Sequence, residues 1–184
     1  IRTWQTAHKM KLQRGALIGV GGCVAQQEKN RILERVPYVD FVFGPDAIQK
    51  LPEIIGRVEA DRVRVVETAW VDSESYVFPR ADPNTSRGKA TEFITVMKGC
   101  DNVCSFCVVP HTRGREVSRP FTEVLQEAAS LTTVGVREVT LVGQNVNSYA
   151  GGISFAQLLL RTAQVPGIER VRFTTSHPQD LSDE

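Results

Sequence analysis

The sequence predicts a mixed α/β protein with parallel strands, and three observations carry this prediction. Short apolar, β-branched segments alternate with amphipathic segments of helical periodicity. Glycine and proline residues separate these segments. The order strand, helix, strand, helix recurs in both halves of the chain, which is typical of a parallel sheet covered by helices.

The first half of the chain contains two expected strands and two expected helices. The strands are residues 16–20, bounded by glycines, and the β-branched and aromatic run 38–43. A helix is predicted over 24–36, where charged residues surround an apolar stripe and Pro37 follows. A second helix is predicted after Gly44–Pro45, with Asp46 as its N-cap and Pro52 bending or shortening it.

Residues 59–90 change in character and are predicted to be a linker or domain boundary. Charged residues come first, and turn-forming residues follow without a periodic apolar face. We therefore expect one partial domain over 1–58 and another over 91–184.

The second half repeats the alternation and is predicted to contain three βα units. Strands are expected over 93–97, 136–142 and 171–175. One helix is expected over 120–133 with Gly135 at its C-terminal cap, and another begins at the cap residue Ser154 and runs through Gln164. Three such units make half of a barrel or part of an open sheet.

Length and charge bound the class of protein. At about 150 residues per domain, 184 residues make one domain with some left over. The net charge of +1 gives no global field, so any nucleic acid must be held by local contacts. No apolar run reaches the roughly 18 residues of a membrane span, and no secretory signal is visible. The chain starts at Ile1 and stops where a helix is expected to begin, so we expect a fragment of a longer chain.

Three of the four cysteines lie within eight residues, at Cys100, Cys104 and Cys107. This spacing is poor for loop-closing disulfides and favours a shared metal centre and a reducing, cytoplasmic compartment. Three thiolates on one loop suit a 4Fe–4S cluster with one iron left open for a small-molecule cofactor. Two alternatives remain: a structural zinc site that adds His111, and thiols that are simply buried.

The glycine segment 19–22 permits two interpretations. It follows a predicted strand and precedes a predicted helix, as a dinucleotide-binding loop does, but Val24 stands where the third glycine of that motif belongs. The other interpretation is a close turn that presents Cys23.

The cysteine loop, with Phe106 before its last cysteine, resembles the signature of radical S-adenosylmethionine (SAM) enzymes. Residues 93–120 as a whole resemble the methylthiotransferase family, and Gly22-Cys23-Val24-Ala25-Gln26 resembles the last cysteine motif of that family's N-terminal domain. Within the family, residues 141–149 and Ser176-His177-Pro178 resemble the MiaB branch, the tRNA-2-methylthio-isopentenyladenosine synthases.

The resemblance implies a fold and an activity. The fold is the C-terminal half of the family's N-terminal α/β domain followed by the first part of a partial radical SAM (βα) barrel. The activity is methylthiolation of adenine C2 in isopentenyladenosine next to the anticodon of tRNA. Other methylthiotransferase branches, acting on threonylcarbamoyladenosine or a ribosomal protein aspartate, are alternatives, as is a zinc-stabilised RNA-binding module.

The resemblance also implies cofactors and partners. Cys100, Cys104 and Cys107 would hold a 4Fe–4S cluster with SAM, and Cys23 would bind a second cluster whose other ligands this chain lacks. The partners would be tRNA, SAM and a flavodoxin or ferredoxin as electron donor, with no membrane and a monomeric full-length enzyme. This fragment is expected to be inactive alone. The expected cofactor-binding residues are Phe106, Gly143, Gln144, Asn145 and Ser176.

Further polar residues have two interpretations each, and no residue is assigned as catalytic. Gln144 and Asn145 suit the SAM amino acid moiety or the target base, or they cap the following loop. Arg113, Arg115 and Arg119 suit RNA phosphates, or they form salt bridges with Glu116 and Glu123. His177 is expected to be structural.

Overall fold

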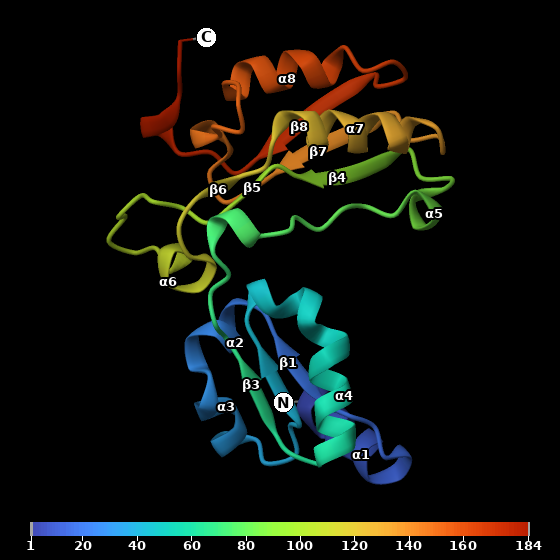
Figure 1. Ribbon diagram of the computed structural model, residues 1–184, viewed down its shortest axis with the longest axis vertical. Helices are drawn as coiled ribbons and strands as arrows, with labels where there is room; N and C mark the ends of the chain where they lie inside the picture. The colour runs from blue at the N-terminus through green and yellow to red at the C-terminus, as the bar shows by residue number, and fades with distance from the viewer. Residues whose placement is uncertain (1, 184) are drawn as a thin grey trace. The chain divides into compact units, whose positions relative to one another are not determined.

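The computed structural model describes residues 2–183 and contains two compact units (Figure 1). The first comprises residues 2–76 with His111–Arg113, and the second comprises residues 77–110 and 114–183. The division after Tyr76 lies within 59–90, the segment that the sequence predicts as a linker.

The first unit is built on a parallel sheet of β1 (Gly19–Gly21), β2 (Phe41–Phe43) and β3 (Val65–Glu67), in that order. Strand β2 lies within the predicted range 38–43, and β1 overlaps the end of the predicted range 16–20. The third falls inside the predicted linker. Its three residues are too few to show a period, and pairing with β2 makes the segment a strand.

Helices cover both faces of this sheet. They are α2 (Cys23–Glu28), α3 (Asn30–Arg35), the 3₁₀ helix η1 (Pro45–Lys50) and α4 (Leu51–Asp61). A further helix, α1 (Arg2–Arg14), precedes β1 in the chain. Phe41 packs with the residues of α4, whereas its neighbour Val42 packs with those of α2 and α3. Successive strand residues point to opposite faces, so the unit has two small cores.

Three predictions for this unit are corrected. The single helix predicted over 24–36 is two helices, interrupted at Lys29 with a φ of 49°. Asp46 does not cap a helix: its side chain is buried and accepts a hydrogen bond from the Val71 amide at 3.1 Å. Pro52 does not bend a helix but lies at the start of α4, where a missing N–H costs nothing.

The second unit contains a parallel sheet of β4 (Thr91–Thr95), β7 (Glu138–Val142) and β8 (Arg170–Thr174). Helices α7 (Phe121–Thr132) and α8 (Phe155–Ala163) pack on each other and against this sheet (Figure 1). These elements confirm the three predicted strands and the first two of the three predicted βα units, since no α-helix follows β8 within the described residues. The Ser154 hydroxyl caps α8 by accepting from the Gln157 amide at 3.2 Å.

A small antiparallel hairpin departs from the predicted strand over 93–97. That strand ends at Thr95, and the chain turns into β5 (Met97–Lys98), which pairs with β6 (Val117–Ser118). The hairpin therefore closes the base of residues 99–116, which contain the three clustered cysteines and the short helix α6 (Val109–Arg113).

Four short elements complete the described chain: η2 (Ser73–Ser75), α5 (Pro83–Ser86), η3 (Val146–Ser148) and η4 (Pro178–Asp180). The helix expected to begin at the end of the chain is not formed by residues 181–183, and Glu184 lies outside the described residues. Within residues 2–183, no helix is long and apolar enough to cross a membrane.

Candidate functional site

Three loops of the second unit meet beyond the carboxyl ends of its strands. One is the cysteine loop, residues 99–116, and the others are residues 143–149 after β7 and 175–180 after β8. Because β4, β7 and β8 are parallel, the chain leaves β7 and β8 at the same edge of the sheet, and the hydrogen bonds described below join these loops to the cysteine loop.

The base of the cysteine loop is held by backbone and ionic contacts. The Cys100 amide donates to the Gly114 carbonyl at 3.2 Å, and the Arg115 guanidinium lies 2.7 Å from the Asp101 carboxylate. The Glu116 amide also donates to Asp101, at 3.2 Å. Gly99 has a φ of 77°, and a Cβ there would lie 2.0 Å from the Arg115 carbonyl oxygen, so this position requires glycine.

The three loop cysteines are free thiols, of which Cys100 is buried and the other two are half-buried. Burial is the main cause that raises the pKa of the Cys100 thiol, and the negative charges of Glu116, Cys107 and Cys104 add to it. A bound cation would reverse this effect by stabilising the thiolates.

The donor set fits an iron–sulfur cluster in its chemistry, since three free thiols share one loop and repel one another as thiolates. However, the described residues contain no group of three His, Cys, Asp or Glu side chains gathered as metal ligands. The three cysteines therefore share one loop, but their side chains are not gathered around a common point. The same holds for the zinc set that adds His111.

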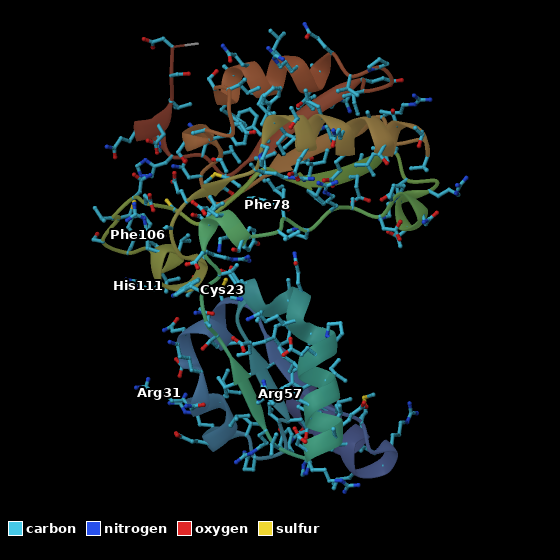
Figure 2. The ribbon with its side chains drawn as sticks, in the orientation of Figure 1. Cys23, Arg31, Arg57, Phe78, Phe106 and His111 are labelled. Atoms are coloured by element: carbon cyan, nitrogen blue, oxygen red, sulfur yellow. The ribbon has the colours of Figure 1, made fainter. Side chains whose placement is uncertain are left out.

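The tip of the cysteine loop is apolar and open. Val103 is 94% exposed and Phe106 is 90% exposed. Figure 2 labels Phe106 on this loop. Nothing within the second unit covers these two side chains.

The loop after β7 holds the cysteine loop from the side. The side-chain Oε1 of Gln144 accepts a hydrogen bond from the Gly99 amide at 2.7 Å. Gly143 lies so close to Met97 that a Cβ would be 2.4 Å from the Met97 Cγ, which keeps this backbone against β5.

Asn145 is 1% exposed, and both ends of its amide are used within the protein. Its Nδ2 donates to the Asp180 carboxylate at 2.7 Å, and its Oδ1 accepts from the His177 amide at 3.1 Å. Of the residues expected to bind cofactor, Ser176 is exposed beside His177.

Sequence reasoning missed Asn102 and Asp180. Asn102 Nδ2 donates to the same Asp180 oxygen at 2.9 Å, so one carboxylate joins the cysteine loop to the loop after β7. The hydrogen bonds from Asn102 and Asn145 hold the pKa of Asp180 below its ordinary value. A polar residue between two motif cysteines was the available signal, but its partner is 78 positions away.

His177 lies against a motif cysteine. Its Nδ1 accepts from the Gln179 amide at 3.2 Å, and its Nε2 is 3.4 Å from the Cys104 sulfur. Because Nδ1 is an acceptor, the neutral ring carries its proton on Nε2, and the N–H points at the sulfur.

One proposed RNA contact is wrong. Arg119 is fully buried, with ion pairs to Glu127 at 2.5 Å and Glu123 at 3.4 Å, so it has no surface to offer a phosphate. Its alternative pairing with Glu123 is confirmed. Arg115 is exposed and pairs with Asp101.

Cys23 belongs to the first unit and is the first residue of α2 (Figure 2). It is half-buried and follows Gly22, whose φ of 100° marks a turn that suits glycine. The glycine segment 19–22 thus places Cys23 at a helix start.

A protein-family profile for the radical SAM superfamily matches residues 94–183. This part of the chain belongs to the radical SAM superfamily. The match begins within β4 and runs through β8, and so includes the cysteine loop and the contacts described above for the three loops that meet there.

Curated relatives extend the comparison beyond the radical SAM segment. The chain is 81% identical over 175 residues to the tRNA-2-methylthio-N(6)-dimethylallyladenosine synthase of Myxococcus xanthus (strain DK1622). It is 70% identical to the protein of that name from Anaeromyxobacter sp. (strain Fw109-5), and 50% identical to that of Geobacter metallireducens. The first two alignments cover 95% of this chain and the third covers 96%.

These relatives confirm the resemblance to the MiaB branch that the motifs indicate. The chain spans 38% of the length of the first two relatives and 40% of the third.

Proposed function

We propose that this chain is part of a radical SAM methylthiotransferase that modifies tRNA at adenine C2 of isopentenyladenosine next to the anticodon. The observation that carries the proposal is the 81% identity to a relative of that name, across both units of the chain. The C-x3-C-x2-C loop within the radical SAM match supports the reaction type.

Cys100, Cys104 and Cys107 would hold the 4Fe–4S cluster of this enzyme. When bound, such a cluster would supply the electron for reductive cleavage of SAM and an open coordination position for SAM. The residues of the chain bind and orient: Gly99 permits the tight base of the loop, and Gln144 fixes that base through the Gly99 amide.

The proposed SAM side of the site comprises the tip residue Phe106 and the loop residues Gly143, Gln144, Asn145 and Ser176. The exposure of Phe106 leaves its ring free to meet a ligand. Gln144 and Asn145 would act here by shaping the loop, because their side-chain amides make hydrogen bonds to the protein itself.

We assign the two units to two family domains. The first would be the C-terminal half of the methylthiotransferase N-terminal domain, in which Cys23 is a ligand of a second cluster. The second would be the first part of the partial radical SAM barrel, with residues 59–90 between them. Parallel sheets in both units support this arrangement.

The proposed partners are tRNA, SAM and a flavodoxin or ferredoxin as electron donor. The full-length enzyme would be a monomer in the cytoplasm. Four free cysteines suit that reducing compartment. The chain spans 38% of its relatives' length, so we expect no methylthiolation of tRNA by these 184 residues alone.

Anaerobic reconstitution with iron and sulfide tests the cluster assignment. We expect wild-type chain and Cys23→Ala to gain the broad brown absorption of a 4Fe–4S cluster that dithionite bleaches, and Cys104→Ala to lose it. The measurement is iron and sulfide per chain together with the absorption spectrum.

Two results would count against the proposal. Stoichiometric zinc with no uptake of iron by the wild-type chain would support the zinc-stabilised module instead. Equal loss of iron in Cys23→Ala and Cys104→Ala would mean that Cys23 shares the first cluster.

A further inference from the structure

Asp180 joins three loops that follow three different strands of the second unit. Its Oδ2 accepts from Asn102 in the cysteine loop at 2.9 Å and from Asn145 after β7 at 2.7 Å. Asp180 itself follows β8. An ionised carboxylate that accepts from two amides makes charge-assisted hydrogen bonds, which are stronger than those between neutral groups.

The two halves of the cysteine loop differ in what holds them. The base is closed by the β5–β6 hairpin and by Asp101 with Arg115 and Glu116. The tip exposes Val103 and Phe106, so apolar packing does not fix it. The contacts of Asn102 and Cys104 lead from the tip to residues 177–180.

Residues 177–180, which make these contacts, are themselves held by hydrogen bonds to the loop after β7. The Asn145 Oδ1 accepts from the His177 amide at 3.1 Å, and Asn147 Nδ2 donates to the His177 carbonyl at 3.3 Å. Asn145 is 1% exposed, so its bonds are protected from competition with water. Asp180 therefore connects the exposed tip of the cysteine loop to the buried Asn145 side chain.

We propose that Asp180 is a positioning residue that holds the tip of the cysteine loop, through Asn102, where Cys104 and Cys107 act as cluster ligands. The purpose of this contact rests on the proposed cluster site. The contact itself is independent of any cluster and is tested without iron.

Hydrogen exchange of the iron-free chain tests the contact at single amides. One amide at each part of the loop serves as a probe: Cys107 at the tip donates to the Cys104 carbonyl, and Cys100 at the base donates to the Gly114 carbonyl. In Asp180→Asn we expect exchange at Cys107 to accelerate by about five-fold or more, because the tip opens locally. Exchange at Cys100 should stay as in the wild type.

Three further variants sharpen the test. Asp183→Asn makes the same change at an exposed aspartate three positions away and should leave both amides unchanged. Asn102→Ala removes the contact from the loop side and should reproduce the effect of Asp180→Asn. The double variant Asn102→Asp with Asp180→Asn exchanges the carboxylate and the amide, and should restore at least half of the lost protection.

The second measurement uses the chain reconstituted with iron and sulfide. In Asp180→Asn we expect the half-time of iron loss to a chelator to shorten by about five-fold. Asp183→Asn should keep the wild-type half-time, which separates positioning from the general effect of removing one carboxylate.

Unchanged exchange at Cys107 in both Asp180→Asn and Asn102→Ala would overturn the proposal. Equal acceleration at Cys100 and Cys107, or no recovery in the double variant, would also overturn it, because either result indicates general destabilisation. If the wild-type chain binds no iron, the proposed function fails, while the exchange experiment still decides whether Asp180 holds the loop.

Discussion

His177 lies where it can tune Cys104, the proposed cluster ligand, rather than bind metal itself. The Gln179 amide occupies its Nδ1, which leaves an Nε2 proton 3.4 Å from the Cys104 sulfur. Hydrogen bonds to the sulfur ligands raise the reduction potential of an iron–sulfur cluster, because they stabilise the more negative reduced state.

Replacing His177 by Phe should therefore lower the potential of the reconstituted cluster. We expect a shift of about 40 mV, which equals about 1 kcal/mol for a one-electron couple. A redox titration followed by electron paramagnetic resonance measures it. His8→Phe, in the first unit, is the control, and an equal shift in both variants would show that the Nε2 proton has no such role.

Tyr149 is almost fully buried, and its hydroxyl donates to the Arg119 carbonyl at 2.6 Å. Burial raises the pKa of Tyr149 to about 12 from its ordinary 10.0. The contribution of this neutral phenol to stability is full below pH 10 and is lost as the pH rises from 10 toward 12, because only the unfolded chain then ionises readily.

Tyr149→Phe should lower the free energy of unfolding by about 1 kcal/mol at pH 8, the usual net value of one hydrogen bond. Urea denaturation at pH 8 and at pH 11 provides the measurement. The gap between variant and wild type should narrow at pH 11. A gap that is constant with pH would contradict the role assigned to the neutral hydroxyl.

The shape of the cysteine loop depends on one glycine. Gly99 combines a φ of 77° with a neighbouring carbonyl that leaves no space for a Cβ. Gly88 has a similar φ of 81°, but nothing lies within 4 Å of its Cβ position. The two positions thus separate backbone strain from steric contact.

Gly88→Ala should cost about 1 kcal/mol of stability from strain alone. Gly99→Ala should cost more and should also reduce the iron bound on reconstitution to less than half, because Arg115 must move. Urea denaturation and iron analysis of both variants check this. Equal iron content in the two variants would mean that the loop tolerates the displacement.

Carboxylates of the second unit make its free energy of unfolding depend on pH in the acidic range. The pKa of Glu92 is lowered chiefly by its hydrogen bond from Ser86, that of Glu123 by Arg80, and that of Asp180 by Asn102. Each lowered pKa contributes stability that is present above the unfolded values of 4.5 for Glu and 3.8 for Asp. That stability is lost as the pH falls through the folded value.

We therefore expect the thermal midpoint of the chain to be constant between pH 5 and pH 7 and to fall below about pH 4.5. Glu92→Gln should make the acid dependence shallower, whereas Glu59→Gln in the first unit should not. Calorimetry from pH 3 to pH 7 measures this. A midpoint independent of pH down to pH 3 would contradict it.

At the scale of the whole molecule, local patterns were sufficient to predict the parallel α/β architecture, α7, α8 and the cysteine loop. The apolar stripe of α7 and the cap Ser154 of α8 are visible within a few residues. Helix α1 was missed because its apolar residues are few and form no continuous stripe. The break at Lys29 leaves no signature in the sequence, and its cause is not evident from the structure.

The arrangement around the cysteines depended on tertiary structure. The spacing of Cys100, Cys104 and Cys107 indicates a shared metal centre from the sequence alone, because ligands on one loop are close by connectivity. The residues that contact this loop are distant in the sequence: Asn102 contacts Asp180 across 78 positions, and Cys104 contacts His177 across 73. Arg119 likewise looks like a surface cation beside the motif until folding buries it against Glu127. Only the packing of the strands brings such distant residues together, and the periodicity of a local segment contains no information about these contacts.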